Sequence, residues 1–239
     1  MTLRILVTND DGINAPGLAV AEKIASELAG SNGKVVTIAP SIDQSGVSHS
    51  ISYLRPSLIE KHNDSRYSVE GSPADCVLAG IYHIMKDYKP NLILSGVNNG
   101  YNLAEDILYS GTVGAAVGGR KLKYPPIATS ISGRSFEHFQ SAVLATELML
   151  NYVSDNYDEN GHTGLVFNVN IPNLPFNELK GFTFTRLGNR GVPLAPEFDG
   201  DDKKVSYKIG KSGDPDGDLT GTDFEAIMNK NISVTPLFW

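Results

Sequence analysis

The stretch RILVTNDDG at residues 4–12 decides how the rest of the chain is organised. Its first five residues predict a short buried strand, because they are mainly apolar and β-branched. Asp10 and Asp11 follow directly, and a helical pattern with Pro16 in its first turn comes next. Open α/β sheets bind ligands beyond the carboxyl ends of their strands, so two adjacent carboxylates there indicate a divalent-metal site. The plainer alternative is a simple turn, since Asn, Asp and Gly are common turn formers.

The segments around this stretch alternate between strand and helix patterns. Apolar residues at helical spacing over residues 18–28 are followed by a second strand at 34–39, which predicts a right-handed crossover between parallel strands. Further core strands are predicted at 91–94, 127–132 and 165–171, and helices at 73–85 and 136–152. We therefore expect an α/β fold with a doubly wound, mostly parallel sheet.

Two regions of the chain are less regular. Strands are predicted at 51–53 and 67–70, and the charged stretch 60–66 between them is predicted as an exposed turn. Beyond Pro172 the pattern changes to short β-like pieces at 182–187 and 205–209, exposed loops, a short helix and a final strand at 232–237.

The change at Pro172 suggests a division of the chain into two parts. Residues 1–172 form the predicted core, and residues 173–239 form a β-rich extension. We expect this extension to pack on the core rather than fold independently, and to serve in oligomerisation.

The composition is that of a soluble globular protein. Of 239 residues, 41% are hydrophobic and 20% are charged, and the net charge of −7 argues against binding of a nucleic-acid polymer. Cys76 is the only cysteine, which suits a reducing compartment and favours a buried structural thiol over a catalytic one. The sequence has neither a signal-peptide pattern nor an apolar run long enough for a bilayer, so we expect a cytoplasmic enzyme without a membrane partner.

Polar residues follow the ends of the other predicted strands. They join Asn9, Asp10 and Asp11 and comprise Ser45, Asn98, Asn102, Ser110 and Thr112. Carboxylate, hydroxyl and amide oxygens suit Mg²⁺ or Mn²⁺ rather than zinc. Glycines beside them, including Gly111, allow backbone amides to face a phosphate. This combination predicts hydrolysis of a phosphate monoester by a metal-activated water.

Other chemistries fit the residues less well. Fingerprints for dinucleotide binding, a P-loop and a nucleophile elbow are absent, and no two of the five histidines have zinc-helix spacing. The acids Asp214, Asp216 and Asp218 suggest either calcium or, more simply, a solvated loop. A phosphoaspartyl mechanism with Asp10 as nucleophile remains open, and His49 is either an acid or base or a hydrogen-bonding loop residue.

Several ordered motifs resemble one family over nearly the whole chain. They are TNDDG at 8–12, APG at 15–17, GSPADC at 71–76, SGVN at 95–98, YSGTV at 109–113, NVNIP at 168–172 and GTDF at 221–224. These motifs look like those of the SurE (stationary-phase survival protein) nucleotidases. The resemblance implies a Rossmann-like three-layer core with a β-rich extension for dimerisation or tetramerisation.

The resemblance also implies an activity and a set of site residues. The activity is hydrolysis of nucleoside 5′- and 3′-monophosphates, with polyphosphate as a further substrate of some members. The family's metal ligands fall on Asp10, Asp11, Ser45 and Asn98, which implies one Mg²⁺ or Mn²⁺ per subunit. Its phosphate-site residues fall on Asn102, Ser110, Gly111 and Thr112, and Asn9 stands beside them.

Two departures from the family pattern bear on these expectations. Tyr101 is bulkier than the usual residue before Asn102, which would alter nucleoside access. The chain stops at Trp239, where many members continue, so a homodimer is expected and a tetramer is the alternative. The competing functional hypothesis is a noncatalytic nucleotide or metal sensor. In the enzyme hypothesis one of the two acids, with Asp11 favoured over Asp10, orients or deprotonates the water.

Overall fold

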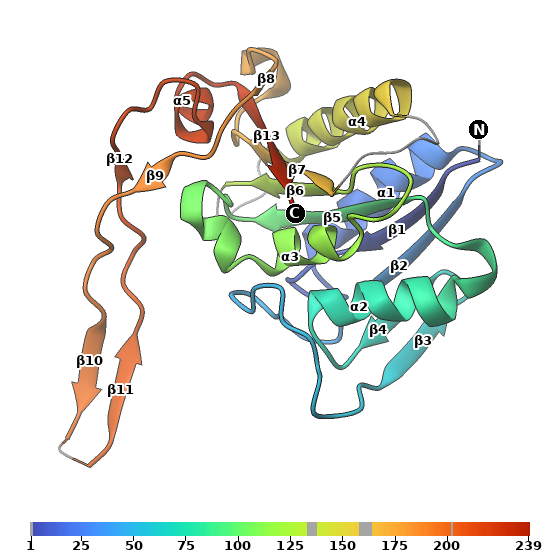
Figure 1. Ribbon diagram of the computed structural model, residues 1–239, viewed down its shortest axis with the longest axis horizontal. Coiled ribbons are helices and arrows are strands. Elements are labelled where there is room, and N and C mark those ends of the chain that lie inside the picture. The colour runs from blue at the N-terminus through green and yellow to red at the C-terminus, as the bar shows by residue number, and fades with distance from the viewer. Residues whose placement is uncertain (1, 133–137, 158–163, 202) are drawn as a thin grey trace.

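The computed structural model describes residues 2–132, 138–157, 164–201 and 203–239. A nine-stranded sheet forms its centre, in the order β3-β4-β2-β1-β5-β6-β7-β13-β8 (Figure 1). The strands from β4 to β7 in this order are mutually parallel. They are β4 (Arg66–Val69), β2 (Lys34–Pro40), β1 (Arg4–Thr8), β5 (Leu92–Asn99), β6 (Ile127–Ile131) and β7 (Leu165–Ile171).

Helices cover both faces of this sheet. Helices α1 (Pro16–Ala29) and α4 (Phe139–Asn156) pack together on one face, and α2 (Pro73–Ala79) and α3 (Gly111–Gly118) pack together on the other. Each face has its own apolar core, which includes Leu18 and Phe167 on the first face and Val77 on the second. The predicted three-layer, mostly parallel Rossmann-like architecture is confirmed.

The start of α2 shows how local sequence sets a helix boundary. The Ser72 hydroxyl accepts a hydrogen bond from the Asp75 amide, and the Asp75 carboxylate accepts one from the Ser72 amide at 2.8 Å. This reciprocal capping box satisfies amides that the helix leaves free. The chain then continues through the wider turn η1 (Gly80–Ile84) and the short helix η2 (Lys86–Tyr88).

The region before α2 differs from the prediction. No strand forms at residues 51–53, and the stretch predicted as an exposed turn instead forms β3 (Ile59–Asn63), paired antiparallel with β4. All of β3 is exposed and it lies at the sheet edge. A charged sequence is typical of such an edge because it discourages pairing with other chains.

The main sheet also extends beyond the predicted last core strand. Strand β13 (Ile232–Phe238) pairs antiparallel with β7, and β8 (Phe182–Phe184) pairs parallel with β13. The segment after residue 172 thus contributes two strands to the sheet. The short helix η4 (Phe176–Glu178) lies between β7 and β8. Helix α5 (Asp223–Met228), which Thr222 caps as predicted, lies between β8 and β13.

The rest of this segment forms an arm that projects from the body (Figure 1). It consists of β9 (Asn189–Arg190) paired with β12 (Pro215–Asp216), and β10 (Glu197–Gly200) paired with β11 (Val205–Lys208). The strand predicted at 205–209 is confirmed as β11, whereas β12 lies in a stretch predicted as loop. In the described part of the chain, none of the helices is long and apolar enough to cross a membrane.

Candidate active site

The site lies where the chain leaves β1 and β5. The chain after β1 enters α1 on one face of the sheet, whereas the chain after β5 passes through η3 (Ala104–Leu108) into α3 on the other. These two strands are neighbours, so their loops diverge and open a crevice at the carboxyl edge. The sequence-predicted acids occupy this crevice.

Asn9 shapes the turn that presents the two acids. Its side chain is fully buried, donates from Nδ2 to the Gly12 carbonyl at 3.0 Å, and accepts from the Gly12 amide at 3.2 Å. Gly12 has a φ of +99°, a conformation that costs glycine little. In the structure Asn9 therefore faces its own turn rather than the pocket.

Asp10 is held from several sides. Only 4% of it is exposed, and its Oδ1 accepts a hydrogen bond from the Thr112 hydroxyl at 2.5 Å. A Cβ on Gly111 would lie 2.8 Å from the Asp10 Cβ, so the start of α3 packs directly on this residue. Burial raises the pKa of Asp10, and the Thr112 hydrogen bond opposes that rise.

Asp11 is more accessible than its neighbour. It is partly buried, and that burial, followed by the negative charge of Asp10, raises its pKa to about 6. The backbone amide of Asn99 donates a hydrogen bond that opposes the rise. Two adjacent carboxylates with raised pKa values are poised to gain free energy from a cation placed between them.

One pocket of about 310 Å³ brings most of the predicted site together. It contains all four predicted metal ligands, Asp10, Asp11, Ser45 and Asn98, and two predicted phosphate contacts, Asn102 and Ser110. The loops after three strands of the sheet converge here, as the order β2-β1-β5 requires. The convergence supports the predicted ligand set, whose roles stay predictions.

A bulge in β5 positions Asn98. The pairing with β6 shifts register between Ser95 and Asn98, where Gly96 has a φ of +127°. A Cβ on Gly96 would lie 2.4 Å from the Thr129 carbonyl oxygen, so only glycine fits at this point. Bulges of this kind re-aim side chains beside active sites.

Asn98 and Ser45 contribute neutral oxygen atoms to the pocket. Asn98 lines the pocket and donates from Nδ2 to the Gly100 carbonyl at 2.9 Å, which leaves its Oδ1 as an acceptor. The Ser45 hydroxyl donates to Asp43 Oδ1 at 2.6 Å and keeps its oxygen lone pairs available. In the described residues no three His, Cys, Asp or Glu side chains form a metal-binding group. The two carboxylates are therefore accompanied in this pocket by neutral oxygens, which hard cations accept as ligands.

Asn102 is fixed by a buried network from β7. Its amide donates to Asn170 Oδ1 at 2.8 Å, and its carbonyl accepts from Asn170 Nδ2 at 3.0 Å and from Asn168 Nδ2 at 2.8 Å. Its own Nδ2 donates to Ser130 Oγ at 2.8 Å. The backbone and side chain of Asn102 are thus both held in place, although the residue lies in a loop.

The segment 110–112 begins α3 at the edge of the pocket. Ser110 caps the helix by accepting from the Val113 amide at 3.1 Å, and its hydroxyl proton remains available. Ser110 lines the pocket, whereas Gly111 and Thr112 lie behind Asp10 and are not among the lining residues. All three residues were predicted to contact the phosphate, and in the structure Ser110 alone of the three lines the pocket.

The pocket also has walls that the sequence did not predict. Asp106 and Tyr109 come from the segment around η3, and Ser212 comes from the arm. Arg190 donates from Nε to Asp106 Oδ1 at 2.9 Å and forms an ion pair with the same carboxylate, so the base of the arm is tied to the pocket rim. Tyr109 stands in the predicted YSGTV motif, but no sequence signal marks Ser212.

Three other residues considered in the sequence lie away from this pocket. His49 keeps much of its surface exposed, and partial burial of its ring, followed by the charge of Arg120, lowers its pKa. Cys76 is fully buried and burial raises the pKa of its thiol well above the usual value, which confirms the structural interpretation. The Tyr101 hydroxyl bonds to Ser132, and this side chain does not line the pocket.

The fold and the site together define a class: a doubly wound α/β protein with an oxygen-lined pocket at the point where adjacent strand connections diverge. The family model described as "Survival protein SurE" matches residues 5–193. The chain belongs to the SurE family, as its motifs indicated.

Named relatives support this membership over the full length. The chain is 42% identical to the "5′-nucleotidase SurE" of Ruegeria pomeroyi, over 98% of this chain and 94% of the relative. It is also 42% identical to the protein of the same name from Beijerinckia indica, over 98% and 90% of the two chains. The crystal structure of the SurE protein from Aquifex aeolicus superposes with a TM-score of 0.83 at 37% identity, covering 98% of this chain and 93% of that one.

Proposed function

We propose that this protein is a divalent-metal-dependent phosphomonoesterase that hydrolyses nucleoside 5′- and 3′-monophosphates to nucleoside and phosphate, with short polyphosphate as a further substrate. The observation that carries the proposal is the single pocket in which Asp10, Asp11, Ser45 and Asn98 meet Asn102 and Ser110. Relatives over the whole chain carry the name 5′-nucleotidase. An acid pair alone would not favour this function, but an acid pair beside a hydroxyl at the start of a helix does.

The proposed cofactor is one Mg²⁺ or Mn²⁺ per subunit, held by Asp10, Asp11, Ser45 and Asn98. When bound, the cation supplies positive charge that stabilises the phosphoryl oxygens and acidifies a water molecule. The chain itself then has to bind the phosphate, orient the water and protect the reacting groups.

The proposed roles follow from how each side chain is held. Asp10 is nearly buried and engaged by Thr112, so it anchors the cation. Asp11 is more open, and we assign it the orientation of the attacking water. Ser110 and Asn102 contact the phosphate, and the start of α3 at Gly111 and Thr112 adds the positive end of the helix dipole.

The test is phosphate release from 5′-AMP and 3′-AMP with Mn²⁺ or Mg²⁺. Asp10→Asn and Asp11→Asn should each lose most of the activity while their circular dichroism spectra match the wild type. Asp64→Asn is the matched control, because Asp64 pairs with Lys61 on the exposed β3–β4 turn and should retain full activity. Nucleotide binding without phosphate release would instead support the noncatalytic sensor.

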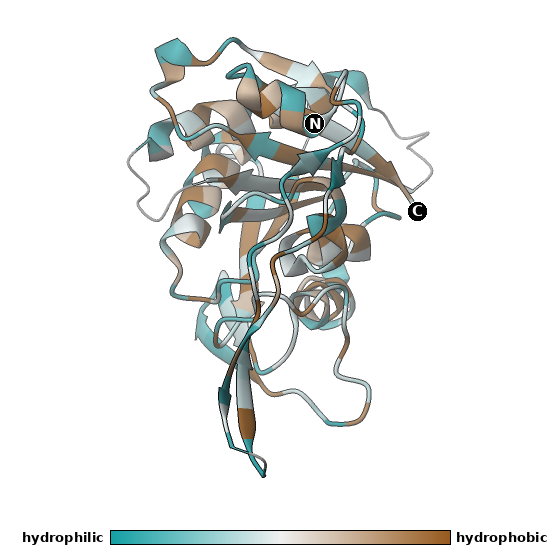
Figure 2. Ribbon diagram, turned by 90° about the vertical axis from the view of Figure 1, so that its left-hand side faces the viewer, coloured by the Kyte–Doolittle hydropathy of each residue, from teal (hydrophilic) through white to brown (hydrophobic). Residues whose placement is uncertain are grey.

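The proposed assembly is a homodimer, with a tetramer as the alternative, and the arm is its contact element. Phe198 and Tyr207 face each other across β10 and β11 with ring centroids 6.1 Å apart, yet 69% and 66% of them are exposed. The hairpin is strongly hydrophobic in part and projects below the body (Figure 2). An isolated two-stranded hairpin is marginally stable in water, so a second copy would stabilise it.

We further propose that residues 173–239 act as an extension packed on a core of residues 1–172, and that the protein works in the cytoplasm on small nucleotides rather than on nucleic-acid polymers. The sharing of one sheet between β7 and β13 supports the packing proposal. Light scattering of the wild type and of Phe198→Ser would test the assembly, because loss of that exposed ring should shift the mass towards the monomer.

A further inference from the structure

The guanidinium of Arg66 connects three separate elements of the fold. Arg66 is the first residue of β4, and β2 lies between β4 and β1 in the sheet. Its side chain nevertheless reaches the loop after β1, where Nη2 donates to the Ile13 carbonyl oxygen at 2.5 Å. Its Nη1 forms an ion pair with Glu22 on α1. One side chain from near the edge of the sheet thus holds the loop that carries both acids beside the helix that follows it.

The contact lies two residues from the Asp11 carboxylate along the chain. Ile13 is 4% exposed, and its amide donates to the Pro40 carbonyl at 2.8 Å. Ile13 is therefore held through its amide by β2 and through its carbonyl by Arg66. Together these two hydrogen bonds fix the path of the loop directly after Asp11.

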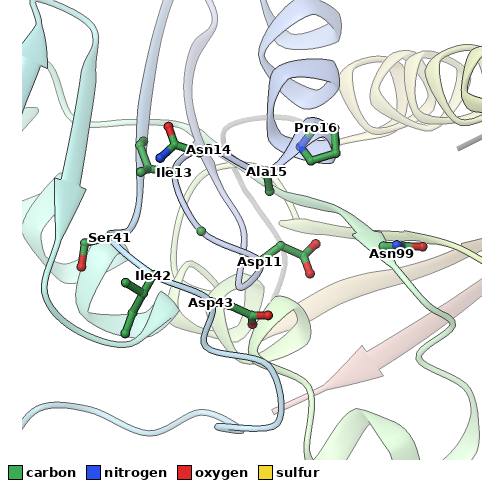
Figure 3. Close-up of a pocket in the computed structure, with 10 residues that line it drawn as sticks. Asp11, Ile13, Asn14, Ala15, Pro16, Ser41, Ile42, Asp43 and Asn99 are labelled. Carbon is green, nitrogen blue, oxygen red and sulfur yellow. The ribbon is translucent and has the colours of Figure 1, made fainter. Parts of the chain in front are cut away.

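The two acids depend on this loop to different degrees. Asp10 is 4% exposed and is also held by Thr112 at the start of α3. Asp11 is only partly buried and accepts a hydrogen bond from the Asn99 amide. Its carboxylate points towards Asn99 and away from Ile13 (Figure 3). The direction of the Asp11 side chain therefore depends more strongly on the path of the loop than that of Asp10 does.

Arginine suits this contact better than lysine does. Its planar guanidinium presents several donors in a fixed fork, so it can bind acceptors on two different elements at once. The base of the side chain is also fixed, because the Ser65 carbonyl accepts from the Thr37 amide at 2.8 Å and Asn63 Oδ1 accepts from the Ser65 amide at 2.9 Å. The stretch 60–66, predicted as an exposed charged turn, thus ends by presenting Arg66 to the loop after β1.

The surroundings of the guanidinium limit its contribution to stability. Arg66 and Glu22 line a cavity of about 240 Å³ that shares no residue with the pocket of the candidate active site. The exposed fractions of their side chains are 27% and 24%. A partly solvated ion pair contributes little to the free energy of folding. Variants of Arg66 are therefore expected to fold, so their effect on the site can be measured.

We propose that Arg66 is a positioning residue of the metal site, which directs the Asp11 carboxylate by holding the Ile13 carbonyl beside α1. The inference rests on the proposed function, because that function assigns Asp11 to the metal ion. It gives the hairpin of β3 and β4 a role in the site, although neither strand lines the pocket.

The test is the affinity of the full-length protein for Mn²⁺, measured by calorimetric titration without substrate. Arg66→Met keeps a long side chain but removes its donors, and it should raise the Kd for Mn²⁺ by about tenfold. Arg66→Lys keeps the charge but not the fork, so it should raise the Kd by at least about threefold, and it replaces Arg66→Met if that variant does not fold.

The matched control is Lys61→Met. It removes the same charge from the neighbouring strand β3, where Lys61 forms an exposed ion pair with Asp64. Because this pair does not reach the loop after β1, the control should change the Kd for Mn²⁺ by less than about twofold.

A second measurement shows whether Arg66 acts through Asp11. Arg66→Met should raise the Kd by about tenfold in the wild-type background and by less than about twofold in Asp11→Asn, because residues that act together give non-additive effects. An equal loss in the two backgrounds would overturn the proposal, as would an equal loss in Lys61→Met. Wild-type affinity in a folded Arg66 variant would also overturn it, and a lower melting temperature with unchanged affinity would show a purely structural role.

Failure of the proposed function has a different signature. A wild type that binds Mn²⁺ but releases no phosphate from 5′-AMP would overturn the phosphatase proposal, and the Mn²⁺ titrations would still decide the role of Arg66. A wild type that binds neither Mn²⁺ nor Mg²⁺ would overturn both.

Discussion

The hydrogen bond between Thr112 and Asp10 offers a sharp test of how the site is held. Thr112→Val removes the hydroxyl that donates to Asp10 Oδ1 and preserves the shape of the side chain. The chain supplies a matched control in Thr146, which is also fully buried but whose hydroxyl has no partner among the described residues. The same substitution therefore removes a bonded hydroxyl at one position and an unbonded one at the other.

The two substitutions should have different effects on the melting temperature. Loss of a buried hydrogen bond to an ionised group costs about 1.5–3 kcal/mol, and each kcal/mol corresponds to roughly 2–4 °C in a domain of this size. Thr112→Val should therefore lower the melting temperature by about 3–12 °C. Thr146→Val should leave the melting temperature unchanged or raise it slightly, because it relieves a buried polar atom without a partner.

The Thr112→Val substitution should also weaken the binding of the metal ion. Groups that orient a metal ligand typically contribute 10–100-fold to metal affinity or activity, so Thr112→Val should weaken Mn²⁺ binding by about that factor. Thr112→Ser keeps the hydroxyl and should recover most of the affinity. Calorimetric titration and thermal unfolding in chelator would measure both quantities. Equal stability losses in Thr112→Val and Thr146→Val, with unchanged Mn²⁺ affinity, would refute this account of Asp10.

Two further predictions concern the site, and a third concerns His49 outside it. Gly111→Ala should cost about 1–3 kcal/mol and most activity, because its Cβ would meet the Asp10 Cβ at 2.8 Å. Gly191→Ala, whose Cβ would come no closer than 3.5 Å to a neighbouring atom, should be close to neutral, and equal effects of the two substitutions would contradict the packing argument. Mn²⁺ at about 100 times its Kd should raise the melting temperature by roughly 5–10 °C in the wild type and by far less in Asp10→Asn, measured against chelator. The pKa of His49 is lowered in the folded protein, so the unfolded chain binds the proton more readily and the free energy of unfolding falls as the pH drops below about 6.5. Denaturant titrations at about pH 7.5 and pH 5.5 should show a smaller loss of unfolding free energy in His49→Gln than in the wild type. An equal loss in both proteins would contradict this role of His49.

The elements that could be predicted from sequence are those whose signals are local. Strand β7 matches the predicted residues 165–171, and Ser72 and Thr222 cap their helices as their positions indicate. Capping and strand alternation involve residues within a few positions of one another, so a short window contains the relevant interactions.

The missed elements depend on pairing between distant segments. The charged residues of β3 have no strand pattern of their own and are ordered by the hairpin with β4. Strand β13 is apolar enough to be recognised, but its place beside β7 depends on the whole sheet. The same reason explains why Ser212 could not be assigned to the pocket, because only the path of the arm brings it there.

By itself the sequence determined which oxygens are available and which strand ends carry them. A set of polar residues that includes Asp10, Asp11 and Asn98 was predicted to meet because parallel strands bring their carboxyl ends to one edge of a sheet. The family resemblance implied Asp10, Asp11, Ser45 and Asn98 as the metal ligands. The family of the chain is indicated by motifs that extend over nearly the whole sequence.

Only the tertiary structure decided how each candidate side chain is used. Asn9 is engaged by its own turn, Thr112 supports Asp10 from behind, and Asn102 is clamped by Asn170 from a strand 68 positions away. A side chain can contact a ligand only with atoms that its neighbours leave free. Which atoms remain free is set by packing and hydrogen bonding across the whole fold, and no local stretch of sequence contains that information.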